Sequence, residues 1–405
     1  MTLQNSLRKV FVVDAVRTPI ARYAGGLATV RPDDLAAHII SSLVTRNQSA
    51  APHLDHVVFG ATNQAGEDNR NVARMALLLA GLPYEVPAVT VNRLCGSGLE
   101  AVADAARLIA MGEADCAIAG GVESMTRAPF SMPKQASAFD RTPPPVYDTT
   151  LGWRYPNPRM EARFPLISMG DTAENVAQKH GISREDQDRF ALESHQKAAR
   201  AWQANAFANE IVPVPVPQKK GEPVLFAKDE CVRADATIEA LTKLAPVFRK
   251  GGSVTAGNSS PINDGASGLL LASADVVERL GLTPLARVIG AQTAGVDPSY
   301  MGEGPIPAVQ KLCQRLGVNI GDIDLVELNE AFAAQSLACV RSLGLDPARV
   351  NVHGGAIALG HPIGSSGARI ACTLVHTMHA QKKALGLASL CIGVGQGIAA
   401  LFERA

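Results

Sequence analysis

Asn92-Arg-Leu-Cys-Gly-Ser-Gly98 places a cysteine between two segments of different periodicity. Residues 86–91 have the apolar character of a buried strand, and residues 98–111 have the pattern of a helix. The glycines allow a sharp turn between the two segments. Cys95 is therefore expected at a helix N-terminus, where peptide dipoles and free N–H groups favour the nucleophilic thiolate. The alternative is a buried structural cysteine, which is a common fate of this residue type.

The alternation of strands and helices continues around this stretch. Residues 10–14, 55–60 and 116–119 are predicted strands, and residues 32–44 and 71–79 are predicted helices. Strands that alternate with helices indicate an α/β fold with a mostly parallel sheet.

The middle of the chain differs in composition. Residues 122–165 are rich in proline and have no period, which is typical of a long substrate loop or lid. Ser183-Arg-Glu-Asp186 is a variant capping box that predicts a helix to about Trp202. Residues 211–217 alternate valine and proline, which suits an edge strand or an extended segment. After Val254 the strand–helix alternation resumes.

The two regular parts of the chain resemble each other. Residues 55–60 resemble residues 322–327 as the start of a strand, and Gly96-Ser-Gly98 resembles Gly364-Ser-Ser-Gly367 as the start of a helix. Self-similarity of this kind favours two similar halves, with an insertion in the first.

Bulk composition excludes several classes of protein. The chain has 405 residues, of which 47% are hydrophobic and 19% charged, so a large core in about two or three packed units is expected. A net charge of zero favours neither nucleic-acid nor membrane partners. The first nine residues lack a secretory signal, and no apolar run reaches membrane-span length. Seven cysteines without a CxxC pair indicate reduced thiols in the cytoplasm and no metal site.

Three further residues have the chemistry to act with Cys95. His361 lies among glycines and before Pro362, which suits an imidazole acting as general base rather than core packing, although a loop histidine without a role is the alternative. Cys391 stands at the end of a predicted strand, where a second thiol can serve as acid and base, although a small apolar strand residue is the simpler explanation. Asn329 follows another predicted strand and can orient a water molecule or polarise a carbonyl, unless it only forms an Asx turn.

Four segments together resemble the thiolase family in order and spacing: NRLCGSG at 92–98, NEAF at 329–332, GGAIALGHPIGSSGAR at 354–369 and CIGVGQG at 391–397. The resemblance implies the thiolase fold, with two similar βαβαβαββ halves in a five-layered αβαβα arrangement and an inserted loop domain. Residues 1–121 with 251–280 would form the N-terminal half, residues 122–250 the loop domain, and residues 281–405 the C-terminal half. A dimer or, more usually for soluble bacterial members of the family, a homotetramer built as a dimer of dimers is also implied.

The resemblance also implies roles for site residues. Cys95 would be the acylated nucleophile and His361 its activator, with a water molecule held by Asn329 completing one oxyanion hole. Cys391 would be the acid and base of carbon–carbon chemistry. The N–H groups of Cys95 and Gly393 would form a second oxyanion hole.

Coenzyme A would be a substrate rather than a bound cofactor. The resemblance places Arg233 and Phe248 near its nucleotide, and it places four residues along the pantetheine tunnel: Ser260, Met169, Ala256 and Phe332. Two positions depart from short-chain members of the family: Ser168 replaces a histidine, and Ala240 replaces a serine near the adenine.

Three features resemble the 3-oxoadipyl-CoA (β-ketoadipyl-CoA) thiolases: residues 63–75, residues 148–155 and Ser168. The implied reaction cleaves 3-oxoadipyl-CoA with CoA into succinyl-CoA and acetyl-CoA. This substrate ends in a second carboxylate, for which Arg154 or Arg163 is the expected partner.

Four alternatives remain at this stage. An acetyl-CoA acetyltransferase would act on acetoacetyl-CoA or medium-chain substrates. A decarboxylating condensing enzyme would have no use for the second thiol of Cys391. A non-catalytic carrier of CoA or lipid would be expected to lose site residues that are all present here. A cysteine hydrolase would release free acid without CoA.

Overall fold

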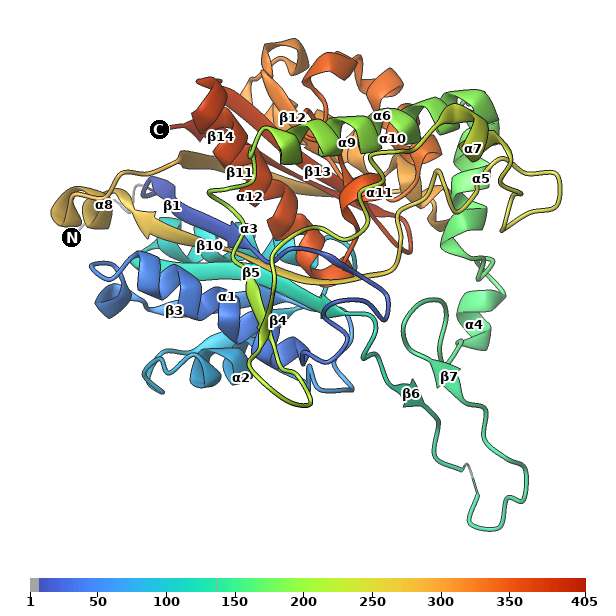
Figure 1. Ribbon diagram of the computed structural model, residues 1–405, viewed down its shortest axis with the longest axis horizontal. Coiled ribbons are helices and arrows are strands. Elements are labelled where there is room, and N and C mark those ends of the chain that lie inside the picture. The colour runs from blue at the N-terminus through green and yellow to red at the C-terminus, as the bar shows by residue number, and fades with distance from the viewer. Residues whose placement is uncertain (1–6, 136) are drawn as a thin grey trace.

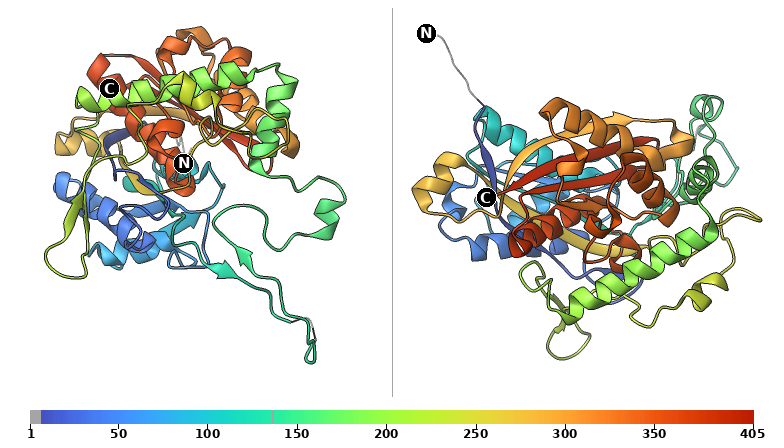
Figure 2. Two further views of the ribbon diagram at one scale, coloured as in Figure 1. Left: turned by 45° about the vertical axis from the view of Figure 1, so that its right-hand side comes forward. Right: turned by 90° about the horizontal axis from the view of Figure 1, so that it is seen from above.

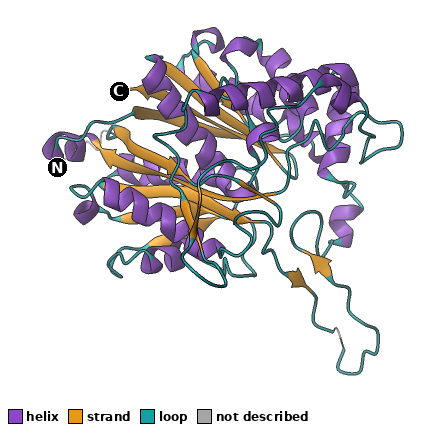
Figure 3. Cartoon of the chain, viewed as in Figure 1, coloured by secondary structure: helices purple, strands orange, loops and turns teal. Residues whose placement is uncertain are grey.

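A mixed sheet forms the N-terminal half of the computed structural model, which describes residues 7–135 and 137–405 (Figures 1 and 3). Its strands follow the order β4 (Ala88–Val91), β3 (His56–Gly60), β5 (Cys116–Ser124), β10 (Asn263–Ser273) and β1 (Val10–Arg17). The first three strands are parallel, and β10 is antiparallel to both of its neighbours. The predicted strands are therefore confirmed, although β5 continues past residue 121. The expected mostly parallel sheet is wrong, because β10 and, in the second half, β14 (Gln396–Arg404) run antiparallel to their neighbours and make most of the strand pairs antiparallel.

The C-terminal half repeats this order. Its strands are β12 (Leu325–Leu328), β13 (Leu385–Ile392), β14 (Gln396–Arg404) and β11 (Ala286–Gly295). Strands β12 and β13 are parallel, and β14 is antiparallel to both neighbours, as β10 is in the first half. An isolated bridge places Val350 beside β12, in the position that corresponds to β4 beside β3 in the first half. The internal repeat expected from the sequence is confirmed.

Helices form three layers around these strands. Helices α1 (Pro32–Arg46) and α2 (Val72–Leu79) cover the outer face of the N-terminal half. Helices α3 (Ser97–Met111) and α12 (Ile363–Gln381) lie between the two halves. Helices α9 (Pro305–Leu316) and α10 (Ala333–Leu343) cover the outer face of the C-terminal half. A short pairing of β1 with β11 at Phe11 and Val12 joins the halves. The αβαβα layering is confirmed (Figure 1).

Shorter elements complete the chain, most of them in the inserted segment. They are β2 (Ala21–Arg22), β6 (Phe130–Ser131), β7 (Tyr147–Asp148), α4 (Pro158–Glu161), α5 (Met169–Lys179), α6 (Arg184–Gln203), β8 (Val214–Val216), β9 (Val224–Phe226), α7 (Ile238–Thr242), α8 (Ala274–Leu280) and α11 (Ala356–Leu359), with 3-10 turns at Ala51–His53, Pro298–Glu303, Ile320–Asp322 and Pro347–Arg349.

The proline-rich part of the insertion forms an arm that extends away from the layers (Figure 2). The short pairing of β6 with β7 and the single turn of α4 give the described part of this arm its regular structure. The predicted extended segment at 211–217 contains β8, which pairs with β9 in a hairpin. Ser183 caps α6 by accepting a hydrogen bond from the Asp186 N–H, as the sequence predicts. None of the described helices is long and apolar enough to cross a membrane.

Candidate active site

Cys95 lies at the N-terminal end of α3, as expected from the sequence. The chain turns sharply after β4, with Leu94 in the left-handed region at φ 46° and its N–H bonded to Asn92 Oδ1 at 2.9 Å. The Ser97 hydroxyl closes the turn, because it donates to the Leu94 carbonyl at 2.6 Å and accepts from the Arg93 N–H at 2.9 Å. These bonds fix the direction of the Cys95 side chain.

Glycines bring the second half of the site to Cys95. A Cβ on Gly98 would lie 2.6 Å from the Ala368 nitrogen, and one on Gly367 would lie 2.2 Å from the Leu99 nitrogen. Helices α3 and α12 therefore cross in backbone contact. The sequence indicated only that these glycines permit turns. Their second role is to place the loop of His361, just before α12, close to the start of α3.

His361 is buried and held at three points. Its N–H donates to Asn263 Oδ1 at 2.8 Å, its Nδ1 lies 2.6 Å from the Ser366 hydroxyl, and its Nε2 lies 3.4 Å from Asn329 Nδ2. Ser366 donates its own proton to the Pro362 carbonyl at 2.9 Å. Its oxygen therefore accepts from Nδ1–H, and this leaves Nε2 as the basic nitrogen. Burial lowers the pKa of His361 to about 4, so the ring is neutral at pH 7.

Asn329 and Cys391 come from neighbouring parallel strands. Asn329 directly follows β12 and its N–H donates to the Ser389 carbonyl of β13 at 2.9 Å. Its amide oxygen is buried and has no hydrogen-bond partner among the described residues, so it is free to accept a bond from a ligand. The thiol of Cys391 is buried near that of Cys95, and both burial and this proximity raise its pKa.

Burial outweighs the helix terminus at Cys95. The residue keeps some exposed surface, but desolvation raises the pKa of its thiol to about 11, against the opposing effect of the N–H groups of Gly393 and Cys95. The helix end and burial thus act in opposite directions on this thiol, and with a pKa of about 11 the Cys95 side chain of the free protein is a thiol at pH 7. Since His361 is also neutral, the pair is an uncharged thiol and an uncharged imidazole.

A cavity of about 740 Å³ lies beside α7 and the segment after it. Of the six residues expected to contact CoA, Arg233 and Ala256 line this cavity, and Ser260 lies between the lining residues Ser259 and Pro261. The sequence analysis missed several other lining residues because nothing local marks them. The full lining is Arg22, His195, Glu230, Cys231, Arg233, Asp235, Ala236, Thr237, Ala240, Leu241, Leu244, Ala256, Gly257, Ser259, Pro261 and Ile357.

The other three expected contacts lie between this cavity and the thiols. Phe332 forms a β-bridge with Ser259 at the cavity and packs in one apolar cluster with Cys391 and Met169. The ring of Phe248 meets that of Phe332 edge-on, with the ring centres 6.2 Å apart. The structure thus places Phe248, Phe332 and Met169 in one series of contacts that leads from Ser259 at the cavity to Cys391.

The family model of the thiolase N-terminal domain matches residues 10–275, and that of the thiolase C-terminal domain matches residues 282–404. The chain belongs to the thiolase family. A beta-ketoadipyl-CoA thiolase of Acinetobacter baylyi is 54% identical over 98% of this chain and 100% of its own length. An acetyl-CoA acetyltransferase of Pseudomonas aeruginosa is 46% identical, again over 98% of this chain and 100% of its own.

Solved structures agree with this assignment. The acetyl-CoA acetyltransferase of Bacillus anthracis superposes with a TM-score of 0.93 at 40% identity, over 99% of this chain and 100% of that one. Human mitochondrial 3-ketoacyl-CoA thiolase in complex with CoA gives a TM-score of 0.91 at 40% identity, over 99% of each chain. The thiolase fold expected from the sequence is confirmed, and the chain is an acyltransferase by family.

This thiolase also has a buried carboxylate beside its nucleophile that the sequence analysis did not identify. Glu123, at the end of β5, accepts hydrogen bonds from the N–H groups of Thr62, Asn63 and Gly364 at 3.0, 3.2 and 2.9 Å. It therefore ties the loop after β3 to the start of α12. Burial raises its pKa to about 7. Its only signal in the sequence was a single acidic residue after an apolar strand.

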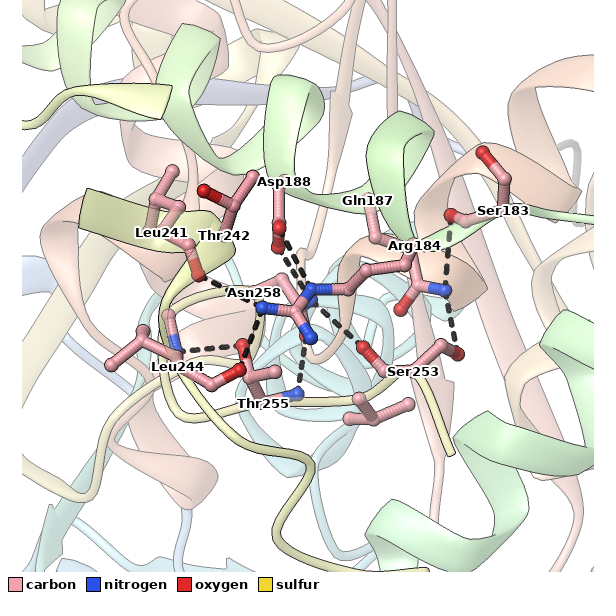
Figure 4. Close-up of polar contacts among 12 residues, drawn as sticks. Ser183, Arg184, Gln187, Asp188, Leu241, Thr242, Leu244, Ser253, Thr255 and Asn258 are labelled. Carbon is pink, nitrogen blue, oxygen red and sulfur yellow. Dashed lines mark hydrogen bonds and ion pairs between the residues drawn. The ribbon is translucent and has the colours of Figure 1, made fainter. Parts of the chain in front are cut away.

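An arginine network supports the cavity wall of this thiolase (Figure 4). Arg184 of α6 pairs with Asp188 at 2.7 Å and donates to the carbonyl oxygens of Leu241 and Leu244 at 2.8 Å each. Asp188 also accepts from Asn258 Nδ2 at 2.9 Å. Since Leu241 and Leu244 line the cavity, α6 fixes the position of α7 and of the segment that follows.

Proposed function

We propose that this thiolase cleaves a 3-oxoacyl-CoA by ping-pong catalysis through an acyl group on Cys95. The observation that carries the proposal is that the thiol of Cys95 lies near the buried thiol of Cys391, while the loop of the neutral His361 packs against the start of α3. A hydrolase or a carrier has no use for the second thiol. Two thiols are needed where one carries the acyl group and the other exchanges a proton with a carbanion.

In the first half-reaction, the Cys95 sulfur attacks the 3-oxo carbon while its proton moves to Nε2 of His361. The bond between C2 and C3 then breaks, and the released enolate of acetyl-CoA takes the proton of Cys391. Acetyl-CoA leaves, and the shortened acyl group remains on Cys95 as a thioester. At this point His361 is protonated and Cys391 is a thiolate.

In the second half-reaction, CoA gives its thiol proton to Cys391, and its sulfur attacks the acyl group on Cys95. The leaving Cys95 thiolate recovers the proton held by His361, so both thiols and the imidazole return to their starting states. The N–H groups of Cys95 and Gly393 would stabilise negative charge on the carbonyl oxygen of the acyl group that Cys95 carries. His361 and a water molecule held by Asn329 would stabilise negative charge on the thioester oxygen of acetyl-CoA.

The roles of the two thiols can be separated by experiment. Replacement Cys391→Ala should abolish cleavage of the carbon–carbon bond but leave exchange of labelled CoA into acetyl-CoA, because that exchange forms no carbanion and His361 can pass a proton to and from the CoA sulfur in place of Cys391. Replacement Cys95→Ala should abolish both reactions and the acyl-enzyme seen by mass spectrometry. Exchange by Cys95→Ala, or carbon–carbon cleavage by Cys391→Ala, would exclude this assignment.

The proposed substrate is 3-oxoadipyl-CoA, which would give succinyl-CoA and acetyl-CoA. The higher identity to the beta-ketoadipyl-CoA thiolase than to the acetyl-CoA acetyltransferase supports this choice. The latter relative makes cleavage of acetoacetyl-CoA the second candidate. Steady-state thiolysis should give the higher kcat/KM for 3-oxoadipyl-CoA, and a higher value for acetoacetyl-CoA would favour the second candidate.

We propose that CoA binds in the 740 Å³ cavity as a substrate, not as a resident cofactor. Arg233 would meet its phosphates, with Phe248 nearby. The pantetheine arm would pass Ser260, Ala256, Phe332 and Met169 on its way to Cys95. The CoA complex of the human relative supports binding of this ligand. Free cysteines throughout the chain support a reducing, cytoplasmic location.

A homotetramer is proposed from two separate exposed apolar surfaces. One surface lies on α2 and the edge strand β4, where Met75, Leu79 and Val89 are exposed. The other lies on the arm, where Phe130 and Phe139 are exposed. Two such surfaces suit a dimer of dimers. Light scattering should give the mass of four chains, and deletion of the arm should give two.

A further inference from the structure

Arg154 is a partly buried arginine without an acidic partner among the described residues. It lies between β7 and α4, and its one hydrogen bond runs from Nη1 to the Thr149 carbonyl at 3.2 Å. The other guanidinium donors are therefore available to a ligand. Arg127, in the same inserted segment, differs because its guanidinium pairs with Glu67.

The first tie of this loop to the reactive centre runs through Thr149. Asn63 Nδ2 donates to the Thr149 hydroxyl at 2.8 Å, and the Asn63 N–H donates to Glu123 at 3.2 Å. Glu123 in turn accepts from the N–H of Gly364, close to His361 in the chain. A short series of hydrogen bonds thus connects the carbonyl that holds Arg154 to the loop of the general base.

The second tie runs through the neighbour of Arg154. The Trp153 indole donates to the Ile167 carbonyl at 3.0 Å, just before α5 begins at Met169. The Met169 sulfur would lie 3.5 Å from a Cβ placed on Gly393, so it borders the proposed oxyanion hole. The loop of Arg154 is therefore anchored both to the start of α12 and to the start of α5. No described residue of 122–168 lines the cavity proposed for CoA, which is consistent with a place for this loop on the acyl side.

The turn after Arg154 is held in place. Tyr155 is in the left-handed region at φ 51°, its hydroxyl bonds Ser131, and its ring packs on Tyr147 with the ring centres 4.9 Å apart. A non-glycine residue keeps this conformation only where its surroundings fix it. A side chain on a fixed turn loses less conformational freedom when it binds a ligand.

From this geometry we propose that Arg154 binds the terminal carboxylate of the acyl chain carried by Cys95. The proposal rests on the proposed function, because it takes 3-oxoadipyl-CoA as the substrate. A guanidinium can meet a carboxylate with two parallel hydrogen bonds, which an ammonium cannot. Arg163, the other candidate from the sequence, is exposed, and its guanidinium lies over the Phe164 ring. Arg163 therefore provides a matched control within the same segment.

The test compares two substrates of equal length, 3-oxoadipyl-CoA and 3-oxohexanoyl-CoA, which differ only in a terminal carboxylate or methyl group. Arg154→Ala should lower kcat/KM for 3-oxoadipyl-CoA about 10- to 100-fold, mainly through KM, as expected for a lost charge-assisted hydrogen bond. The same variant should turn over 3-oxohexanoyl-CoA within about twofold of wild type, which also shows that it folds. Arg154→Lys should recover part of the loss, and Arg163→Ala should match wild type on both substrates.

Three results would overturn the assignment of Arg154 alone. The first two are an equal loss on both substrates in Arg154→Ala and a selective loss on 3-oxoadipyl-CoA in Arg163→Ala, and the third is a wild-type preference for 3-oxoadipyl-CoA that Arg154→Ala retains. If the wild-type enzyme shows no preference for 3-oxoadipyl-CoA over 3-oxohexanoyl-CoA, then the proposed substrate fails and the role of Arg154 fails with it.

Discussion

The Nδ1 atom of His361 lies 2.6 Å from the hydroxyl of Ser366, one turn into α12. Because Ser366 donates its own proton to the Pro362 carbonyl, it can only accept from the imidazole. Ser366 is thus a positioning residue that keeps the lone pair of His361 on Nε2, where a general base needs it.

Replacement Ser366→Ala should lower kcat about 10- to 100-fold with little change in the KM for CoA, because the basic nitrogen is no longer fixed. Steady-state thiolysis measures both constants. Ser365→Ala is the matched control, since the hydroxyl of Ser365 bonds Ser267 and not His361. Ser366→Thr should recover activity. Equal losses in the two alanine variants would indicate a general packing effect instead.

The raised pKa of Cys95 predicts slow alkylation at neutral pH. With a pKa of about 11, the thiolate fraction at pH 7 is small. As long as the pH stays below the pKa, this fraction rises about tenfold for each unit by which the pH is raised. The rate of inactivation by iodoacetamide should therefore keep rising between pH 7 and pH 9. Cys95→Ser gives the background from Cys231, which is partly exposed. A plateau below pH 8 would mean that the thiolate already exists in the free enzyme.

The crossing of α3 and α12 should not tolerate a methyl group. Alanine at position 367 gains helix propensity worth about 1 kcal/mol, but its Cβ would lie 2.2 Å from the Leu99 backbone nitrogen. We expect Gly367→Ala to lower the free energy of unfolding by about 3 kcal/mol. Urea unfolding followed by circular dichroism measures this change.

Gly321→Ala is the control for this prediction. A Cβ on Gly321 meets nothing within 4 Å, and its φ is not positive. The control should change the free energy of unfolding by less than about 0.5 kcal/mol. If Gly367→Ala is as stable as this control, the two helices have room to separate and the close crossing does not hold them.

The Arg184 network should affect the binding of CoA rather than the rate of the chemical steps. Arg184→Lys keeps a positive charge near Asp188 but loses the bonds to the carbonyl oxygens of Leu241 and Leu244, which line the cavity. We expect the KM for CoA to rise about three- to tenfold with kcat unchanged. Arg189→Lys, on the same helix but paired only with Glu185, should match wild type. A fall in kcat without a change in KM would contradict this role.

Local sequence was enough to predict the turn at Cys95, the cap at Ser183 and the strands that carry Asn329 and Cys391. Each of these depends on neighbours in the chain, such as the glycines after Cys95 or the acidic residue after Ser183. The repeat was visible for the same reason, because its two copies have the same local pattern.

The charge state of Cys95 could not be predicted in this way. The helix terminus is a local feature and favours a thiolate. Burial, the charge of Glu123 and the N–H group of Gly393 also act on the pKa of Cys95, and they come from parts of the chain that meet only in the fold. Glu123 was missed because its partners, Thr62, Asn63 and Gly364, converge only in the fold. The choice between Arg154 and Arg163 likewise depended on contacts that no local pattern shows.

Because α3 of the first repeat must pack against α12 of the second, the active site is completed only late in the synthesis of the chain. The nucleophile belongs to the first repeat, but His361 and Cys391 belong to the second and leave the ribosome near the end of translation. A nascent chain with a folded first half therefore has Cys95 without its base or its second thiol. Such a chain cannot be acylated by cellular thioesters through this mechanism, so reactivity appears only when the final helix and strands dock.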